Sequence, residues 1–128
     1  MIAVDTSALM AIVLGEAAAD ACIRALETEP EVVISAGTLA ELLIVAARRN
    51  VADEMSSLID GLGLEVAPVT AAAARRIAEA YGRWGKGQNP AGLNFGDCFA
   101  YEAAKTHGCR LLYVGDDFAQ TDVESVLS

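Results

Sequence analysis

The sequence contains a single histidine, His107, among its 128 residues. Nucleophilic mechanisms that pair a serine or a cysteine with histidine would all have to recruit that one side chain. His107 falls in the last turn of an expected helix, where a polar or positive side chain compensates the helix dipole. We therefore expect a structural role for His107, and chemistry that does not depend on a histidine base.

Cysteines and long apolar runs are also scarce. The three cysteines, Cys22, Cys98 and Cys109, are odd in number and form no C-x-x-C pair, which predicts reduced thiols and a cytoplasmic location. The longest apolar run, Ala8 to Leu14, is far too short to span a bilayer. Asp5 interrupts the segment in which a secretory signal would need apolar residues, so we expect no membrane partner.

Basic residues are outnumbered, with 9 Lys and Arg against 18 Asp and Glu and a formal net charge of -9. This balance excludes a general nucleic-acid coat protein, which needs a basic face. It permits cation binding through carboxylates or a basic partner, although many of the acids serve only solubility. Length and a hydrophobic content of 54% predict one folded domain over residues 1–128.

Strand and helix patterns alternate along the chain. Short apolar strands are expected at 2–4, 32–34, 64–67 and 111–114, and helices at 8–14, 17–27, 35–50, 51–62, 70–84 and 94–107. The tail 121–128 carries an apolar set that suggests a further edge strand. This alternation predicts an α/β sandwich, with helices covering a mainly parallel central sheet of four or five strands.

Several acidic residues lie directly after predicted strands or near predicted helix starts, positions that a parallel sheet brings to one edge. Asp5 ends the first strand, Asp116 and Asp117 follow the last, and Glu41 and Asp97 lie in early helical turns. Ligands bind outside the carboxyl ends of parallel strands, and helices begin at the same edge. Carboxylates held close together repel one another, and a divalent cation removes that conflict. Oxygen ligands select Mg²⁺ or Mn²⁺.

Three of these acids also have a purely structural explanation, which the sequence leaves open. Asp5 can cap the helix that follows it, as Thr6 or Ser7 could. Asp97 stands three residues after Asn94, at the position of a capping box. Glu41 can be an acid favoured by the dipole near a helix start.

One basic patch stands out on this acidic chain. Arg75, Arg76, Arg83 and Lys86 lie on helix 70–84 and the glycine-rich loop 85–92, and no acid occurs between Glu79 and Asp97. The patch is either a solvated helix face or a place where phosphate is held.

Four segments together resemble a known family. They are Val4-Asp5-Thr6-Ser7-Ala8-Leu9, Glu41 on the third helix, Leu93-Asn94-Phe95-Gly96-Asp97-Cys98-Phe99-Ala100-Tyr101 and Gly115-Asp116-Asp117-Phe118. The pattern is similar to PIN-domain ribonucleases over essentially the whole chain, and more narrowly to the VapC toxins of type II toxin–antitoxin pairs. The resemblance implies endonucleolytic cleavage of RNA, such as tRNA or ribosomal RNA, with Mg²⁺ or Mn²⁺. It also implies homodimers and inhibition by a cognate VapB-type antitoxin.

The resemblance assigns roles to individual residues. It maps Asp5, Glu41 and Asp97 onto the acidic metal site, and leaves Asp116 and Asp117 competing for a fourth position. Asp117 is favoured because the family's acid usually directly precedes the phenylalanine, here Phe118. The positions expected to orient ligands or substrate are Thr6, Ser7 and Asn94, and those expected to hold RNA phosphate are Arg83 and Lys86.

Two other functions fit parts of the same pattern. A haloacid-dehalogenase-like phosphatase also places an Asp after its first strand, but needs a second acid two residues later, where this chain has Ser7. A non-catalytic acidic module would use the carboxylates only to bind a basic partner. A phosphate-ester assay separates the phosphatase from a ribonuclease, and cleavage of RNA that a chelator abolishes separates the module from a ribonuclease.

Overall fold

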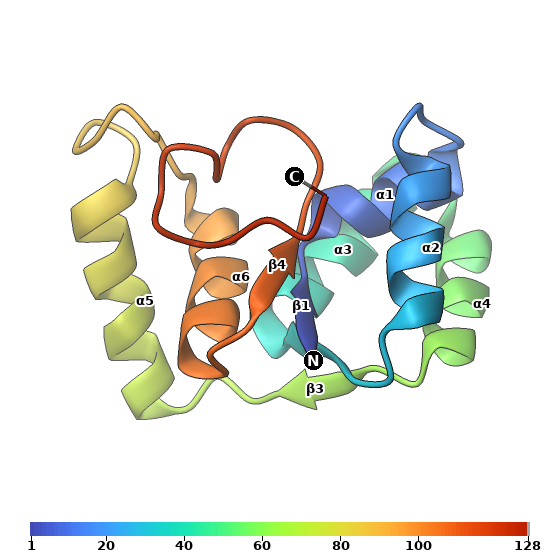
Figure 1. Ribbon diagram of the computed structural model, residues 1–128, viewed down its shortest axis with the longest axis horizontal. Helices are drawn as coiled ribbons and strands as arrows, with labels where there is room; N and C mark the ends of the chain where they lie inside the picture. The colour runs from blue at the N-terminus through green and yellow to red at the C-terminus, as the bar shows by residue number, and fades with distance from the viewer. Residues whose placement is uncertain (128) are drawn as a thin grey trace.

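The protein is described by a computed structural model that covers residues 1–127. Strands and helices alternate as the sequence predicts, and their ends lie within a few residues of the expected ones (Figure 1). The elements are β1 Ile2–Val4, α1 Thr6–Leu14, α2 Ala19–Thr28, β2 Val32–Ser35, α3 Ala36–Arg48, α4 Ala52–Leu62, β3 Glu65–Ala67, α5 Ala71–Trp84, α6 Phe95–Thr106 and β4 Arg110–Leu112.

The four strands form one sheet in the order β3-β2-β1-β4, and every pair is parallel. β1 lies between β2 and β4, where Ile2 is paired with Val32 on one side and with Arg110 on the other. All carboxyl ends therefore meet at one edge of the sheet. In Figure 1, β1 and β4 run upward toward that edge. The predicted α/β fold with a parallel sheet is confirmed.

The tail contributes less to the sheet than expected. Leu111 and Ser125 form a single isolated bridge, supported by hydrogen bonds from Leu111 N to Glu124 O at 2.8 Å and from Val126 N to Leu111 O at 3.1 Å. The predicted edge strand is thus reduced to one point of pairing, because β4 offers only three residues before the chain turns away. The last position of that tail, Ser128, lies outside the described residues.

Alternation along the strands divides the core into two clusters. Ile2, Val4 and Leu112 pack with α1, α2, α3 and α4, whereas Ala3 and Leu111 pack with α5 and α6. Figure 1 shows α5 and α6 on one side of the sheet and α1, α2 and α4 on the other. The helices thus cover both faces of the sheet and leave its carboxyl edge accessible.

The structure also accounts for the residues expected to be structural. His107 is the C-cap of α6, and its Nδ1 lies 2.8 Å from the carbonyl oxygen of Ala103. Cys22 and Cys98 are buried free thiols, and Cys109 is partly buried. Over residues 1–127, no helix has the length and apolar character needed to cross a membrane.

Candidate functional site

Asp5 is both a helix cap and a buried carboxylate. It directly follows β1, and its Oδ2 accepts hydrogen bonds from Ser7 N at 3.1 Å and from Ser7 Oγ at 2.6 Å. Its other oxygen, Oδ1, is buried and has no hydrogen-bond partner among the described residues. Capping therefore explains one oxygen of Asp5 and leaves the second available for a ligand.

Glu41 reaches the same edge from α3. Thr6 Oγ1 donates a hydrogen bond of 2.8 Å to Glu41 Oε1, which joins α3 to the first turn of α1. The carboxylate of Glu41 also lies against Gly96, beside Asp97 at the start of α6. Three helix starts therefore meet around this side chain.

Asp97 is held by the capping box that its spacing predicted. Its Oδ2 accepts Asn94 N–H at 3.0 Å, while Asn94 Oδ1 accepts Asp97 N–H at 2.8 Å. Asp97 is only 8% exposed. The structural role and a ligand role are compatible, since the capping box engages only one carboxylate oxygen.

The acids interact electrostatically across this edge. The pKa of Asp97 is raised to about 7, mainly by burial and also by the charges of Asp5, Asp117 and Glu41, while the hydrogen bond from Asn94 lowers it. Burial likewise raises the pKa of Asp5 to about 6, with a contribution from Glu41, while the hydrogen bonds from Ser7 lower it. Perturbed carboxylates of this kind concentrate at functional sites.

Asp116 and Asp117 lie in the loop that follows β4, and both are exposed. Asp117 is among the charges that raise the pKa of Asp97, whereas Asp116 is not. The buried side chain of Phe118 fixes this part of the loop. This electrostatic coupling to Asp97 distinguishes Asp117 from Asp116.

The residues of this edge suit a hard divalent cation in their chemistry. Their donors are all oxygens, and one of them, Asp5 Oδ1, is a buried carboxylate oxygen without a partner. Within residues 1–127, however, no three His, Cys, Asp or Glu side chains stand close enough together to form a finished ligand set. A cation at this edge would therefore require the acids to move closer together than they lie in this structure.

The polar residues expected to orient ligands or substrate all have defined positions. Thr6 binds Glu41, Ser7 binds Asp5, and Asn94 caps α6. The Ser7 hydroxyl also accepts a hydrogen bond of 3.0 Å from Val114 N, which ties α1 to the end of β4. These side chains therefore support the acids directly.

The two expected phosphate-binding residues differ in their surroundings. Arg83 lies at the end of α5 with its Cζ 4.5 Å from the centre of the Trp84 ring, and its Nη1 is 3.7 Å from Asp122 Oδ2. Lys86 is exposed, and its side chain forms no ion pair in the described part of the chain. Arg83 is thus already engaged, and Lys86 is available.

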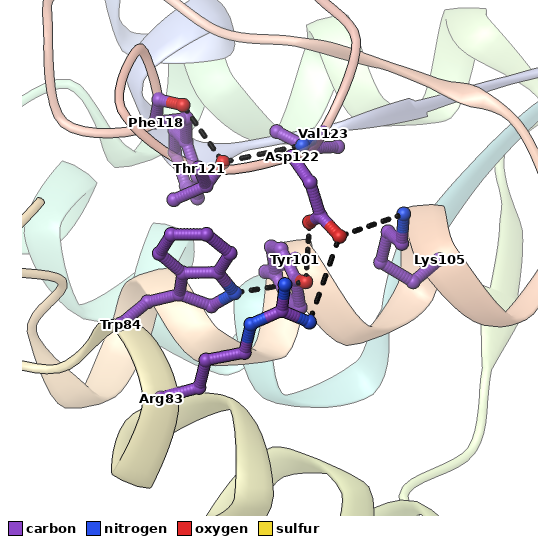
Figure 2. Close-up of polar contacts among 8 residues, drawn as sticks. All are labelled: Arg83, Trp84, Tyr101, Lys105, Phe118, Thr121, Asp122 and Val123. Atoms are coloured by element: carbon purple, nitrogen blue, oxygen red, sulfur yellow. Dashed lines mark hydrogen bonds and ion pairs between the residues drawn. The ribbon is translucent and has the colours of Figure 1, made fainter.

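Sequence reasoning missed one polar cluster next to this edge. Tyr101, Asp122 and Lys105 meet Arg83 and Trp84 where the final loop crosses α5 and α6 (Figure 2). Tyr101 lies in an apolar pattern, and Asp122 follows Thr121 in a tail assigned to an edge strand. No local signal links them, because they lie 21 residues apart in sequence.

The chain is similar to known proteins in sequence and in fold. A family model described as the PIN domain matches residues 2–124. Ribonuclease VapC42 of Mycobacterium tuberculosis is 43% identical over 125 residues, which cover 94% of this chain and 95% of that protein.

Solved structures share the fold. The structure of Mycobacterium tuberculosis VapC20, titled a sarcin-ricin loop cleaving toxin, matches this chain with a TM-score of 0.81 at 22% identity. The match covers 100% of both chains. A toxin–antitoxin complex from Klebsiella pneumoniae contains a chain that matches with a TM-score of 0.71 at 18% identity. The match covers 95% of this chain and 93% of that chain.

Proposed function

The chain belongs to the PIN-domain family and is a ribonuclease of the VapC type, and we propose that it cuts RNA at the acidic carboxyl edge of its sheet. PIN-domain ribonucleases generally use a divalent metal ion. The observation that supports this site is the set of buried, mutually repelling carboxylates around Asp5 and Asp97. Such an arrangement is unfavourable by itself and is relieved by a cation.

Asp5, Glu41, Asp97 and Asp117 would hold that cation, which we take to be Mg²⁺ or Mn²⁺. Bound there, it would supply activation of a water molecule and neutralisation of charge on the scissile phosphate. Ser7 and Thr6 hold the carboxylates of Asp5 and Glu41 at the edge of the sheet. Asn94 holds Asp97 through its backbone N–H.

The RNA would approach along the acid-free loop between α5 and α6. Lys86 is the base best placed to meet a phosphate there, because its side chain has no ion pair among residues 1–127. Arg83 could contribute only by leaving Asp122 or by sharing it. We propose tRNA or ribosomal RNA as the substrate class, read through shape and single-stranded bases.

A cognate antitoxin of the VapB type is the proposed protein partner, and a homodimer the proposed assembly. The structural neighbour from Klebsiella pneumoniae is itself a toxin–antitoxin complex. On this chain, Leu43 and Ile44 of α3 leave 45% and 54% of their surface exposed, which gives a partner apolar helix surface to cover. The three free thiols support a cytoplasmic location.

The two alternative functions have no comparable support. Ser7, where a haloacid-dehalogenase-like phosphatase needs a second acid, is instead a hydrogen-bond donor to Asp5. A non-catalytic acidic module would not account for a 43% identical relative named as a ribonuclease.

The direct test incubates purified protein with cellular RNA in the presence of Mg²⁺, Mn²⁺ or a chelator, and sequences the new ends. Metal-dependent cleavage that Asp97→Asn abolishes supports the proposal. Cleavage that persists in chelator would contradict the role of a cation, and absence of cleavage under all conditions would contradict the activity.

A further inference from the structure

The loop that carries Asp117 leaves the sheet at β4 and returns to it at Ser125. Its first anchor is Phe118, which is buried and packs on Tyr113 with ring centres 5.0 Å apart. Thr121 Oγ1 donates to Phe118 O at 2.7 Å and accepts from Val123 N at 3.3 Å (Figure 2). The backbone on the far side of Asp117 is thereby folded into a compact turn.

The second anchor is Asp122. Tyr101 Oη donates a hydrogen bond of 2.6 Å to Asp122 Oδ1, and Trp84 Nε1 donates to the same Tyr101 oxygen at 3.0 Å. Lys105 Nζ and Arg83 Nη1 lie 3.4 Å and 3.7 Å from Asp122 Oδ2. Figure 2 shows these groups converging on Asp122 from α5 and α6.

This anchoring of the loop matters for Asp117 because the Asp117 side chain has no polar contact of its own among the described residues. Among residues 1–127, the Asp117 carboxylate makes no hydrogen bond or ion pair. Its position relative to Asp97 is therefore set by the backbone of the loop alone. α6 carries Asp97 near its start and Tyr101 one turn later, so one helix holds both the acid and the residue that fixes the opposing loop.

We propose that Asp122 is a positioning residue for the cation site: its contacts with Tyr101, Lys105 and Arg83 fix the loop on α5 and α6 and so place Asp117 opposite Asp97. The inference rests on the proposed ribonuclease function. Asp122 does not touch the cation or the RNA, and it acts only through Asp117. Arg83 then contributes by holding Asp122, in addition to any contact with phosphate.

A double-mutant cycle tests whether Asp122 acts through Asp117. Mn²⁺ binding is measured by calorimetry for the full chain, for Asp122→Ala, for Asp117→Asn and for the double variant. Glu124→Gln is the matched control, because it removes one negative charge from the same segment without breaking an ion pair of the described residues. Tyr101→Phe is a second variant, which removes the shortest bond to Asp122 together with the hydrogen bond that Trp84 donates to the same oxygen.

We expect Asp122→Ala to weaken Mn²⁺ binding about 10-fold, as loss of an outer-shell residue does, and Tyr101→Phe to weaken it by less. In the Asp117→Asn background, Asp122→Ala should have no further effect on Mn²⁺ binding, although it should still lower the melting temperature. Glu124→Gln should bind Mn²⁺ as the unmodified chain does.

An equal loss of Mn²⁺ affinity in both backgrounds would overturn the inference, because Asp122 would then act independently of Asp117. Unchanged affinity in Asp122→Ala would overturn it as well. If the unmodified chain neither binds Mn²⁺ nor cuts RNA, the proposed function fails together with this inference. If the unmodified chain binds Mn²⁺ and cuts RNA, but the effects of Asp122→Ala and Asp117→Asn on Mn²⁺ affinity are additive, the inference alone fails.

Discussion

Glu41 occupies the space in which a side chain at position 96 would begin: a Cβ atom on Gly96 would lie 2.7 Å from Cδ of Glu41. Gly96 is therefore required for the carboxylate of Glu41 to rest beside Asp97. Gly82 in α5 provides the opposite case, because nothing lies within 4 Å of a Cβ added there.

Gly96→Ala should displace the carboxylate of Glu41 and slow RNA cleavage by roughly 100-fold, the effect of moving a catalytic group by about 1 Å. Gly82→Ala should leave cleavage unchanged and stabilise the fold by about 0.5–1 kcal/mol, since alanine replaces glycine within a helix. Cleavage rates and chemical denaturation measure both effects. Equal cleavage by the two variants would show that the position of Glu41 is unimportant.

Asp97→Asn should abolish cleavage and at the same time stabilise the metal-free protein at about pH 8. The substitution removes a buried charge that repels Asp5, Asp117 and Glu41, while the amide oxygen can still accept the hydrogen bond from Asn94 N. Asp53→Asn, in the first turn of α4, is the control and should leave cleavage unchanged. A lower melting temperature in Asp97→Asn would contradict the repulsion argument.

The stability of the metal-free protein should fall as pH rises from about 4 to about 7. Asp5 and Asp97 have pKa values of about 6 and about 7 in the fold, raised mainly by burial from 3.8, so the native state binds more protons than the unfolded chain across this range. Each group then reduces the free energy of unfolding by up to about 1.4 kcal/mol per pH unit.

Urea denaturation in chelator at several pH values measures this slope. Asp122 contributes in the opposite sense, because the hydrogen bond from Tyr101 lowers its pKa in the fold. Its contribution to stability is lost only as the pH falls below 3.8, the ordinary pKa of an aspartate, and so lies outside this range. A free energy of unfolding that rises between about pH 5 and about pH 7 would be incompatible with two buried carboxyls of raised pKa.

Binding of Mg²⁺ or Mn²⁺ should raise the melting temperature and release protons near neutral pH. Asp97, with a pKa of about 7, must lose its proton before it can bind a cation. Affinity should therefore weaken by up to about 10-fold per pH unit below about pH 6 for each proton displaced. Calorimetry in buffers of different ionisation enthalpy counts these protons, and Asp97→Asn should release fewer.

Local patterns predicted much of the site. The spacing of Asn94 and Asp97 gave the correct start of α6, since a cap is determined by a few neighbouring residues. For α1 the sequence offered Asp5, Thr6 and Ser7 as alternative caps and predicted a start at residue 8, whereas Asp5 is the cap and the helix begins at Thr6. Parallel strands then brought these ends together. Glu41 was expected at this edge from its place near a helix start, but its contacts with Thr6 and Gly96 could not be predicted, because an acid near a helix start has no unique partner in sequence.

The contacts of Asp122 could not be predicted in this way. Tyr101 belongs to α6 and Asp122 to an irregular loop, and their hydrogen bond depends on how that loop crosses two helices. The same tertiary effect reduced the expected edge strand to a bridge at Ser125. Irregular segments without periodicity carry little information about where they pack.

The order of the strands has a consequence for how the protein is made on the ribosome. β1 is synthesised first, yet it is completed on one side only by β4, and the loop with Asp117 follows β4. The contacts that hold this loop on the sheet and on α6 require residues up to Ser125. The proposed cation site is therefore incomplete until the loop that follows β4 has been synthesised.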